Sequence, residues 1–347
     1  MATNAQFRSE PATKPRRADL LALWGGILFS LAFSALIWWA GQRLATVPHL
    51  PDTGPSWYYW KLPEPTFWSR ATAWGFYLLH QFAIWGLIYA AQSRGARYTT
   101  GLHRFNIAAL AANAFFIGLH FVQTHLWYDG LAQDVSIWSS QASVIVLLVW
   151  VLLMENRRRG MFFGKKLPIK LEIIRFARKY HGYFFAWATI YTFWYHPMEP
   201  TSGHVIGFFY MFLLLLQGSL FFTRIHTNRW WTLAQEVIVL AHGALVAVMQ
   251  GNELWTMFAF GFGGIFVITQ MHGLGLSRWV KWLILTLYIV AALVIYGMRD
   301  ITMIHQILWI PIIEYLGVLL LAGLFGAGLW VAGRFRGRQS KPEGASA

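Results

Sequence analysis

Apolar runs of about twenty residues recur along the whole chain of 347 residues, separated by short polar segments that carry most of the charge. A run of this length crosses the hydrocarbon core of a bilayer as one α-helix. Ten such runs predict ten transmembrane helices, near residues 19–42, 68–92, 105–128, 135–154, 177–196, 204–225, 230–249, 254–273, 279–297 and 307–333. The predicted fold class is therefore all-α, a polytopic helical bundle in a membrane.

The net charge of +14 is distributed unevenly about these runs. If the N-terminus is cytoplasmic, all but four of the 28 Lys and Arg residues fall on the cytoplasmic side; the exceptions are Arg43, Lys61, Arg70 and Arg299. This asymmetry obeys the positive-inside rule and predicts that both termini are cytoplasmic. The basic charge therefore indicates topology, and we expect no nucleic-acid partner. The expected location is a bacterial inner (cytoplasmic) membrane.

Polar segments divide the chain into few parts. Residues 1–18 and 334–347 are polar and basic and are expected to be disordered arms, which leaves residues 19–333 as a single transmembrane domain. The outer loop 43–67 combines five prolines with the aromatic cluster WYYW, a composition that suits the interfacial belt. The cytoplasmic stretch 155–176 is basic with an apolar period, so we expect an amphipathic helix in contact with anionic membrane lipids.

Several kinds of chemistry are excluded by the residue types present. The chain has no cysteine, which rules out disulfides, thiolate ligands and c-type haem attachment. It contains no Walker, dinucleotide-binding or HExxH motif, so nothing supports ATP or nicotinamide chemistry within the chain. The candidate ligands for a metal or cofactor are therefore the twelve histidines and the few carboxylates.

Five histidines are predicted at two levels of the bundle. His181 and His196 lie on one predicted helix, fifteen residues or roughly 22 Å apart along the axis and nearly on the same face. Near the cytoplasmic face, His226 or His272 is placed to pair with His181, and near the outer face His242 is placed to pair with His196. Paired imidazoles at two depths would supply the axial ligands of two b-type haems.

In this layout, residues 177–249 resemble the transmembrane core of ferric reductases, NADPH oxidases and b-type cytochromes, where paired histidines on two helices hold haems at two depths. The resemblance concerns spacing and not a sequence signature. One departure is that His226 and His242 are separated by the HTNRWW turn and do not share an uninterrupted helix. The resemblance implies haem b as the cofactor and electron transfer across the bilayer. A quinol or a partner dehydrogenase would supply the electrons.

Charged residues near these histidines extend the hypothesis. Arg224 and Arg229 flank His226 at the cytoplasmic boundary, where they would hold haem propionates or lipid phosphates. Glu236 lies two turns into a predicted helix, where a carboxylate must be paired, protonated or hydrated. Glu236 is therefore either a structural partner of a histidine or arginine, or a catalytic proton relay that serves redox chemistry. Glu314, in the last predicted helix, poses the same question.

The stretch HPMEPTSGH suggests a second chemistry. Together with the end of an earlier predicted helix it gathers imidazoles and carboxylates at the outer face, namely His120, His125, Asp129, His196, Glu199 and His204. Neutral imidazoles with carboxylates suit a Zn, Fe or Cu ion. A polar loop broken by prolines is the structural explanation of the same residues.

Three functions remain open from the sequence. The leading one is a membrane b-type haem protein that carries electrons across the bilayer, a transmembrane oxidoreductase. The alternative is a metal-dependent enzyme acting at the outer leaflet on a lipid-like substrate. A pigment-binding or assembly subunit of the membrane is the third, favoured by the 20 tryptophans. The sequence leaves the oligomeric state open.

Overall fold

The computed structural model describes residues 18–54, 58–251 and 253–339. Across these residues the chain is built from ten α-helices and five short 3-10 helices, with no strand. Seven of the α-helices are long and apolar enough to cross a membrane, namely α1, α3, α4, α6, α7, α9 and α10. The protein is thus a helical, multi-pass membrane protein.

The helices follow the order of the predicted apolar runs. Their bounds are α1 Ala18–Gly41, α2 Phe67–Ser93, α3 Arg104–Trp127, α4 Ile137–Arg159, α5 Leu171–Tyr195, α6 Ser202–Ser219, α7 Arg229–Met249, α8 Trp255–Ile268, α9 Arg278–Arg299 and α10 Trp309–Gln339; the 3-10 helices are η1 Gln42–Thr46, η2 Leu131–Gln133, η3 Ile225–Thr227, η4 Gln270–Gly273 and η5 Ile301–Leu308. α8 is the shortest α-helix among them, with 14 residues. Its length of about 21 Å is less than the roughly 30 Å of a hydrocarbon core.

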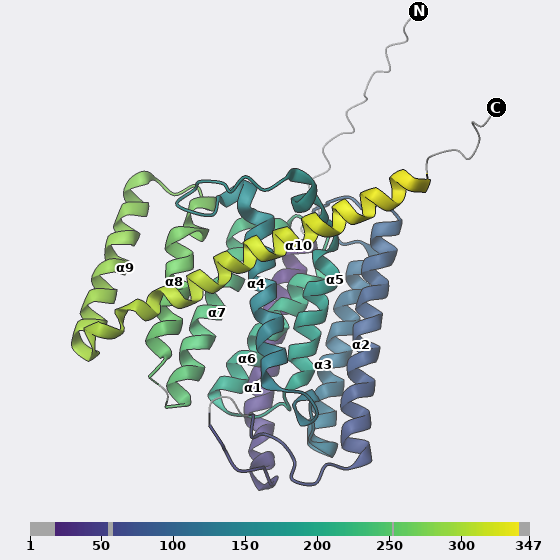
Figure 1. The fold of residues 1–347 in the computed structure, drawn as a ribbon. Coiled ribbons are helices and arrows are strands. Elements are labelled where there is room, and N and C mark those ends of the chain that lie inside the picture. Colours follow the sequence, from purple (N-terminus) through teal and green to yellow (C-terminus); the bar gives the residue numbers. More distant parts are fainter. Residues whose placement is uncertain (1–17, 55–57, 252, 340–347) are drawn as a thin grey trace, which may run out of the picture.

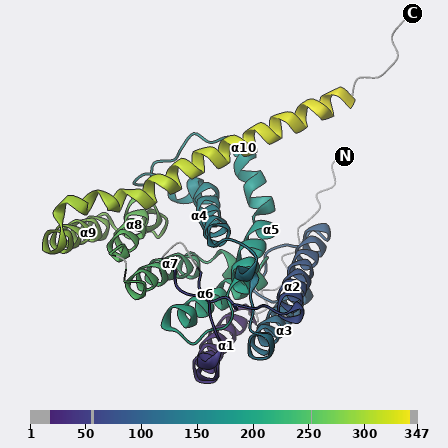
Figure 2. The ribbon, with the colours of Figure 1, turned by 60° about the horizontal axis from the view of Figure 1, so that its bottom comes forward.

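Helix α5 lies at the centre of the bundle, in contact with α2, α4, α6 and α10. Phe193, Trp194 and Tyr195 in its last turn are fully buried in the largest core. Helices α7, α8 and α9 extend to one side in a row, and α10 crosses obliquely over α8, α4 and α5 (Figures 1 and 2). The start of α1 and the end of α10 lie at the same end of the bundle (Figure 1), which we call the inner end.

The segment 155–176 does not form the separate amphipathic helix that we expected. Its first residues end α4, its last residues begin α5, and a loop joins the two. Gly160 and Gly164 adopt φ values of +74° and +82° in this loop, where a Cβ on Gly160 would lie 2.4 Å from the Gly164 carbonyl group. The regularly spaced apolar residues of this segment instead pack into the bundle: Ile174, in the first turn of α5, is 1% exposed.

The loop 43–67 also differs from the expectation of a simple interfacial belt. Its described parts, residues 43–54 and 58–67, lie over the end of the bundle opposite the inner end, which we call the outer end (Figure 1). Tyr58 is only 7% exposed, and its ring lies 4.9 Å from the His196 ring. The Trp60 ring lies 5.2 Å from the His204 ring. These aromatic side chains cover histidines, which the composition of the loop alone did not indicate.

Candidate functional site

Two histidines meet at the inner end of the bundle, and we call them the inner pair. His181 lies in the third turn of α5, and His226 lies in η3 between α6 and α7. Their ring centroids are 6.1 Å apart, with an angle of 40° between the ring planes. Of the two partners predicted for His181, the fold therefore brings His226 into contact.

Both rings of the inner pair are held in a defined tautomer. His181 Nδ1 lies 2.7 Å from the carbonyl oxygen of Arg178, and His226 Nδ1 lies 2.9 Å from that of Gln217. A carbonyl oxygen only accepts, so each Nδ1 carries the proton and donates it. In a neutral imidazole the lone pair then resides on Nε2, the arrangement seen when a protein orients a histidine to bind a metal.

Side chains around His226 fix the position of η3. The Gln217 amide nitrogen donates to the His226 carbonyl oxygen at 3.0 Å, and the Trp231 indole donates to the Gln217 amide oxygen at 2.6 Å. Asn228 caps α7 by accepting hydrogen bonds from the backbone nitrogens of Trp230 and Trp231. The turn that interrupts the two helices is therefore ordered by its own polar side chains.

The second candidate partner, His272, lies elsewhere. Its Nε2 bonds to the Val267 carbonyl oxygen at 3.2 Å, and its ring packs 5.9 Å from that of Phe163. It belongs to η4 beside the loop that follows α4, and the contact seen between His181 and His226 has no counterpart at His272 among the described residues.

The two arginines beside His226 are exposed. Arg229 stacks over the Trp230 ring at 5.5 Å. Within the part of the chain that the structure describes, neither Arg224 nor Arg229 forms an ion pair with a carboxylate. Two cations without carboxylate partners among the described residues therefore lie close to His226 in the sequence.

Three histidines gather at the outer end, and we call them the outer cluster: His196, His204 and His242. His196 directly follows α5, His204 is the third residue of α6, and His242 lies on α7. The rings of His196 and His204 are 5.6 Å apart. His242 packs against α6 at Gly207, where an added Cβ would lie 3.0 Å from its Nε2.

The members of the outer cluster differ in their hydrogen bonds. His204 has a partner at each ring nitrogen, Thr201 Oγ1 at 2.8 Å from Nδ1 and the Tyr58 hydroxyl at 3.0 Å from Nε2. Nδ1 of His196 is buried without a partner, and the described residues provide no hydrogen bond to its Nε2 either. Neither ring nitrogen of His196 therefore has a hydrogen-bond partner among the described residues, whereas the His242 ring bonds to the backbone of Gly203.

Close backbone approaches set the position of the HPMEPTSGH stretch. A Cβ on Gly41, at the end of α1, would lie 2.7 Å from Pro200, and one on Gly130 would lie 2.5 Å from the Tyr195 carbonyl oxygen. Thr201 caps α6 by accepting from the backbone nitrogen of His204 at 3.3 Å. Glycine at these two points lets neighbouring segments pack closely against the start and the middle of the stretch.

A chain of three polar groups runs beside the outer cluster. The Tyr128 hydroxyl bonds to a carboxyl oxygen of Glu199, and His49 Nε2 lies 2.5 Å from the same hydroxyl. Glu199 is 4% exposed, whereas the His49 side chain retains 19% of its exposure. These three hydrogen-bonded groups therefore connect a buried carboxyl group to the protein surface. Sequence reasoning missed this connection, because His49 and Tyr128 lie far from Glu199 along the chain.

Burial changes the proton affinity of these loop residues. It raises the pKa of Glu199 from 4.5 to about 7, against the opposing effect of the Tyr128 hydrogen bond. It raises the pKa of Asp129 from 3.8 to about 6 and lowers the pKa of His49. The carboxyl group of Glu199 consequently exchanges its proton near neutral pH.

The residues predicted for an outer metal site are dispersed among separate roles. His120 is fully buried and bonds to the His196 carbonyl oxygen and to Gln123. His125 Nδ1 donates to the Phe121 carbonyl oxygen at 2.8 Å. Asp129 accepts from the Gly130 backbone nitrogen, and its second oxygen is buried without a partner.

Metal-binding geometry is not found among these groups. Across the described ranges, no three His, Cys, Asp or Glu side chains are arranged to hold a metal ion together. A Zn, Fe or Cu site at the outer end, and the enzyme built on it, stay predictions.

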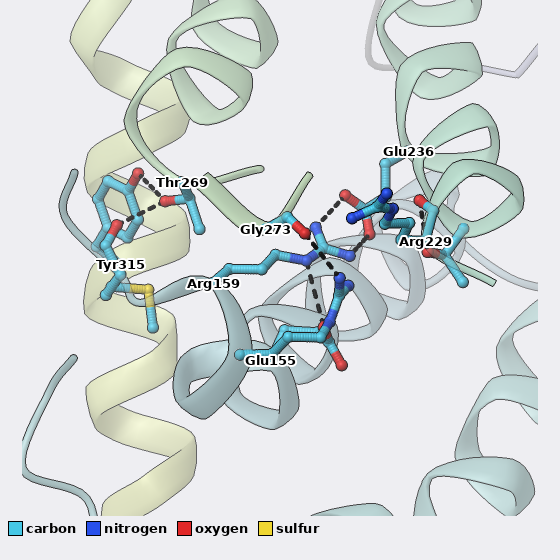
Figure 3. Close-up of polar contacts among 10 residues, drawn as sticks. Glu155, Arg159, Arg229, Glu236, Thr269, Gly273 and Tyr315 are labelled. Atoms are coloured by element: carbon cyan, nitrogen blue, oxygen red, sulfur yellow. Dashed lines mark hydrogen bonds and ion pairs between the residues drawn. The ribbon is translucent and has the colours of Figure 1, made fainter. Parts of the chain in front are cut away.

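Glu236 lies in a strong ion pair (Figure 3). Its two carboxyl oxygens each accept from the Arg159 guanidinium at 2.5 Å. Arg159 is 4% exposed and also reaches Glu155 at 3.3 Å. Of the two roles considered for Glu236, this geometry favours the structural one, because a bidentate partner holds the carboxylate in its charged form.

The five histidines of the two groups share a further property. Each keeps part of its surface accessible. By contrast, His80 and His120 are 0% exposed and have partners at both ring nitrogens. The bundle thus contains histidines that packing buries completely and histidines that it leaves partly accessible.

Comparison with protein-family models, curated proteins and solved structures finds no match for this chain. The functional argument therefore depends on the geometry of the site.

Proposed function

We propose that this protein is a b-type haem protein that carries electrons across a membrane, with histidine ligands at two levels of the bundle. The observation that carries the proposal is the inner pair. His181 and His226 face each other from different elements, and both hold their Nδ1 protons on backbone carbonyl oxygens. When bound, a haem supplies a centre that takes up and releases one electron.

The two imidazoles of the inner pair, whose ring centroids are 6.1 Å apart, would hold the haem iron from two different elements of the fold. The unpaired Arg224 and Arg229 lie next to His226 in sequence and would hold the haem propionates by charge-assisted hydrogen bonds.

At the outer end, we assign His196 and His242 as the ligands. His196 has no hydrogen bond at either ring nitrogen, so a ligand would complete it, whereas both nitrogens of His204 are already used. His242 reaches the same cluster from α7 and lies against the small surface of Gly207. His181 lies on α5 and His196 directly follows its last residue, so one central segment of the chain would contribute to both redox levels.

The distribution of basic residues supports one orientation of the protein in the membrane. Ten membrane crossings with both termini in the cytoplasm agree with the basic residues of the sequence, and put the inner pair on the cytoplasmic side. A bacterial inner membrane is the location we propose. Electrons would come from a quinol or a partner dehydrogenase, because the chain carries no nucleotide-binding motif.

The test is an absorption spectrum of the detergent-purified protein, oxidised and then reduced with dithionite, together with haem extraction and metal analysis. We expect the reduced α band of b-type haem. His181→Ala and His226→Ala should each remove the inner haem and leave the outer one.

The matched control is His272→Ala, which removes a cytoplasmic-side histidine that lies outside the inner pair and should leave haem content unchanged. A colourless protein, or equal haem content in all three variants, would contradict the proposal. A colourless protein that binds zinc, iron or copper would point instead to the metal enzyme at the outer leaflet.

A further inference from the structure

A small cavity lies inside the bundle, away from the histidines. It is enclosed by α4, α7, α8, η4 and α10, and its volume of about 20 Å³ for the centre of a water molecule is enough for one water. Its polar lining comes from Glu236, Gln270 and Glu314, and the remaining five side chains are apolar. Two carboxyl groups therefore face one water-sized space within the membrane-spanning part of the protein.

The two carboxyl groups have different surroundings. Glu236 is neutralised by Arg159, which in turn contacts Glu155 (Figure 3). Glu314 is 4% exposed and forms no hydrogen bond or ion pair with any residue in 18–54, 58–251 or 253–339. A buried carboxylate without a partner is costly, so the group is expected to be neutral or to bind a cation.

Charges on the surrounding helices do not supply that partner. On α4, Arg158 and Arg159 are matched by Glu155 and, across the interface, by Glu236. Four groups thus carry no net charge between them. A negative charge on Glu314 would stand alone beside Glu236.

The nearby titratable groups on η4 and α10 are also engaged elsewhere. His272 bonds to the Val267 carbonyl oxygen, and the Tyr315 hydroxyl shares a hydrogen bond with Thr269 at 2.9 Å (Figure 3). Neither therefore offers Glu314 a neutralising contact.

We propose that Glu314 is a proton-binding site within the membrane, which holds its proton as a neutral acid and exchanges it with a water molecule in the cavity. The ligand is a proton and not a metal cation. A hard cation such as Ca²⁺ takes about six to eight oxygen ligands, and this cavity offers one free carboxyl group, one carboxamide and room for one water.

The ion-pair network separates this site from the cytoplasmic surface. Arg159 is buried, whereas the Arg158 side chain retains 37% of its exposure and bonds to Glu155 and, at 3.4 Å, to the Gly273 carbonyl oxygen. Loss of the proton from Glu314 would place a second carboxylate near Glu236, and the two would compete for Arg159. Protonation of Glu314 therefore stabilises the network in the arrangement observed.

The experiment uses dicyclohexylcarbodiimide, an apolar reagent that adds to protonated carboxyl groups, on the full-length purified protein. Mass spectrometry of peptides should find the adduct on Glu314 and not on Glu236, because only Glu314 carries a proton. Above the pKa of the group, labelling should fall about tenfold per pH unit, following the protonated fraction. Excess sodium chloride should not protect.

Glu314→Gln should abolish the adduct, and Glu172→Gln, which changes an exposed carboxylate on α5, should leave it unchanged. Because Gln has the shape of a neutral Glu, this variant retains the cavity. Its infrared difference spectrum between low and high pH should lose one protonated-carboxyl band.

A label on Glu236, protection by sodium, or an infrared band that persists in Glu314→Gln would each overturn the proposal. None of these readouts requires haem, so the test is independent of the electron-transfer function proposed above.

Discussion

The inner pair and the outer cluster stand roughly 22 Å apart along α5, yet they use their ring nitrogens in different ways. At the inner end, both histidines donate from Nδ1 to backbone carbonyl oxygens. At the outer end, the His204 ring bonds to two hydroxyl groups and the His196 ring bonds to none of the described residues. Backbone carbonyls only accept, whereas hydroxyls donate and accept, so the inner end specifies one tautomer and the outer end does not.

The charged groups near the inner pair also differ from those near the outer cluster. Arg224 and Arg229, which form no ion pair with a carboxylate of the described residues, lie two and three residues from His226 of the inner pair. The outer cluster is bordered by the Glu199, Tyr128 and His49 chain, which ends in a carboxyl group that titrates near neutral pH. The inner end thus fixes the tautomer of both its histidines, whereas the outer end combines a histidine without ring hydrogen bonds with a buried carboxyl group whose pKa is raised to about 7. If both ends bind haem as proposed, proton exchange is expected beside the outer haem only.

The largest expected effect separates two neighbouring histidines of the outer cluster. His196→Ala should lose the outer haem completely, because His196 supplies a free ring nitrogen, whereas His204→Asn should retain it. Extracted haem per protein and the reduced spectrum measure both. Equal loss in the two variants, or loss only in His204→Asn, would show that the outer ligands have been assigned to the wrong residues.

Much of the fold follows from the sequence. Hydropathy sets the order of the helices, and α1, α2 and α3 begin and end within a residue of the predicted runs. The segment 155–176 was misjudged because its apolar period is the same for a surface helix and for the start of a bundle helix. Only the tight turn at Gly160 and Gly164 divides it, and the spacing of glycines alone does not reveal that turn.

The site was less predictable, because it depends on contacts between helices. Spacing along α5 placed His181 and His196 on one face, but it left His226 and His272 as equal partners until packing separated them. Tyr58 was assigned to the membrane interface because the WYYW cluster has that composition. Whether a loop folds back over the bundle is decided by approaches such as that of Gly41 to Pro200, which involve distant segments.

The second prediction concerns the proton chemistry of the outer end. The folded-state pKa of Glu199, about 7, lies above its ordinary value of 4.5, so the folded state binds more protons between these values and its stability falls as pH rises through them. Glu199→Gln stays neutral. It should match the wild type near pH 4.5 and exceed it at pH 8 by up to about 3 kcal/mol.

Thermal unfolding midpoints in detergent at the two pH values measure this difference. Glu64→Gln, at an exposed position shortly before α2, is the matched control. It should shift the unfolding midpoint by the same small amount at both pH values. A stabilisation of Glu199→Gln that is larger at pH 4.5 than at pH 8 would mean that the carboxyl group is charged in the folded state, and would remove the contrast between the two ends.

The third prediction tests whether the inner end is held rigidly. Gln217→Ala removes the donor to the His226 carbonyl oxygen and the acceptor of the Trp231 indole. Leaving these buried groups unpaired should cost about 2 kcal/mol and weaken haem retention at the inner site alone. Gln141→Ala, at an exposed position on α4, serves as the control. Normal inner haem binding in Gln217→Ala would show that η3 does not need this clamp.

The smallest expected effect is that of Tyr58→Phe. The change removes the hydroxyl that bonds to His204 Nε2 at 3.0 Å but keeps the ring that covers His196 at 4.9 Å. Loss of one hydrogen bond should lower the free energy of unfolding by about 1 kcal/mol, measured by thermal unfolding, with both haems retained. If the outer haem is lost instead, the hydroxyl of Tyr58 orients a ligand through His204. In that case the outer end, like the inner end, depends on a fixed tautomer.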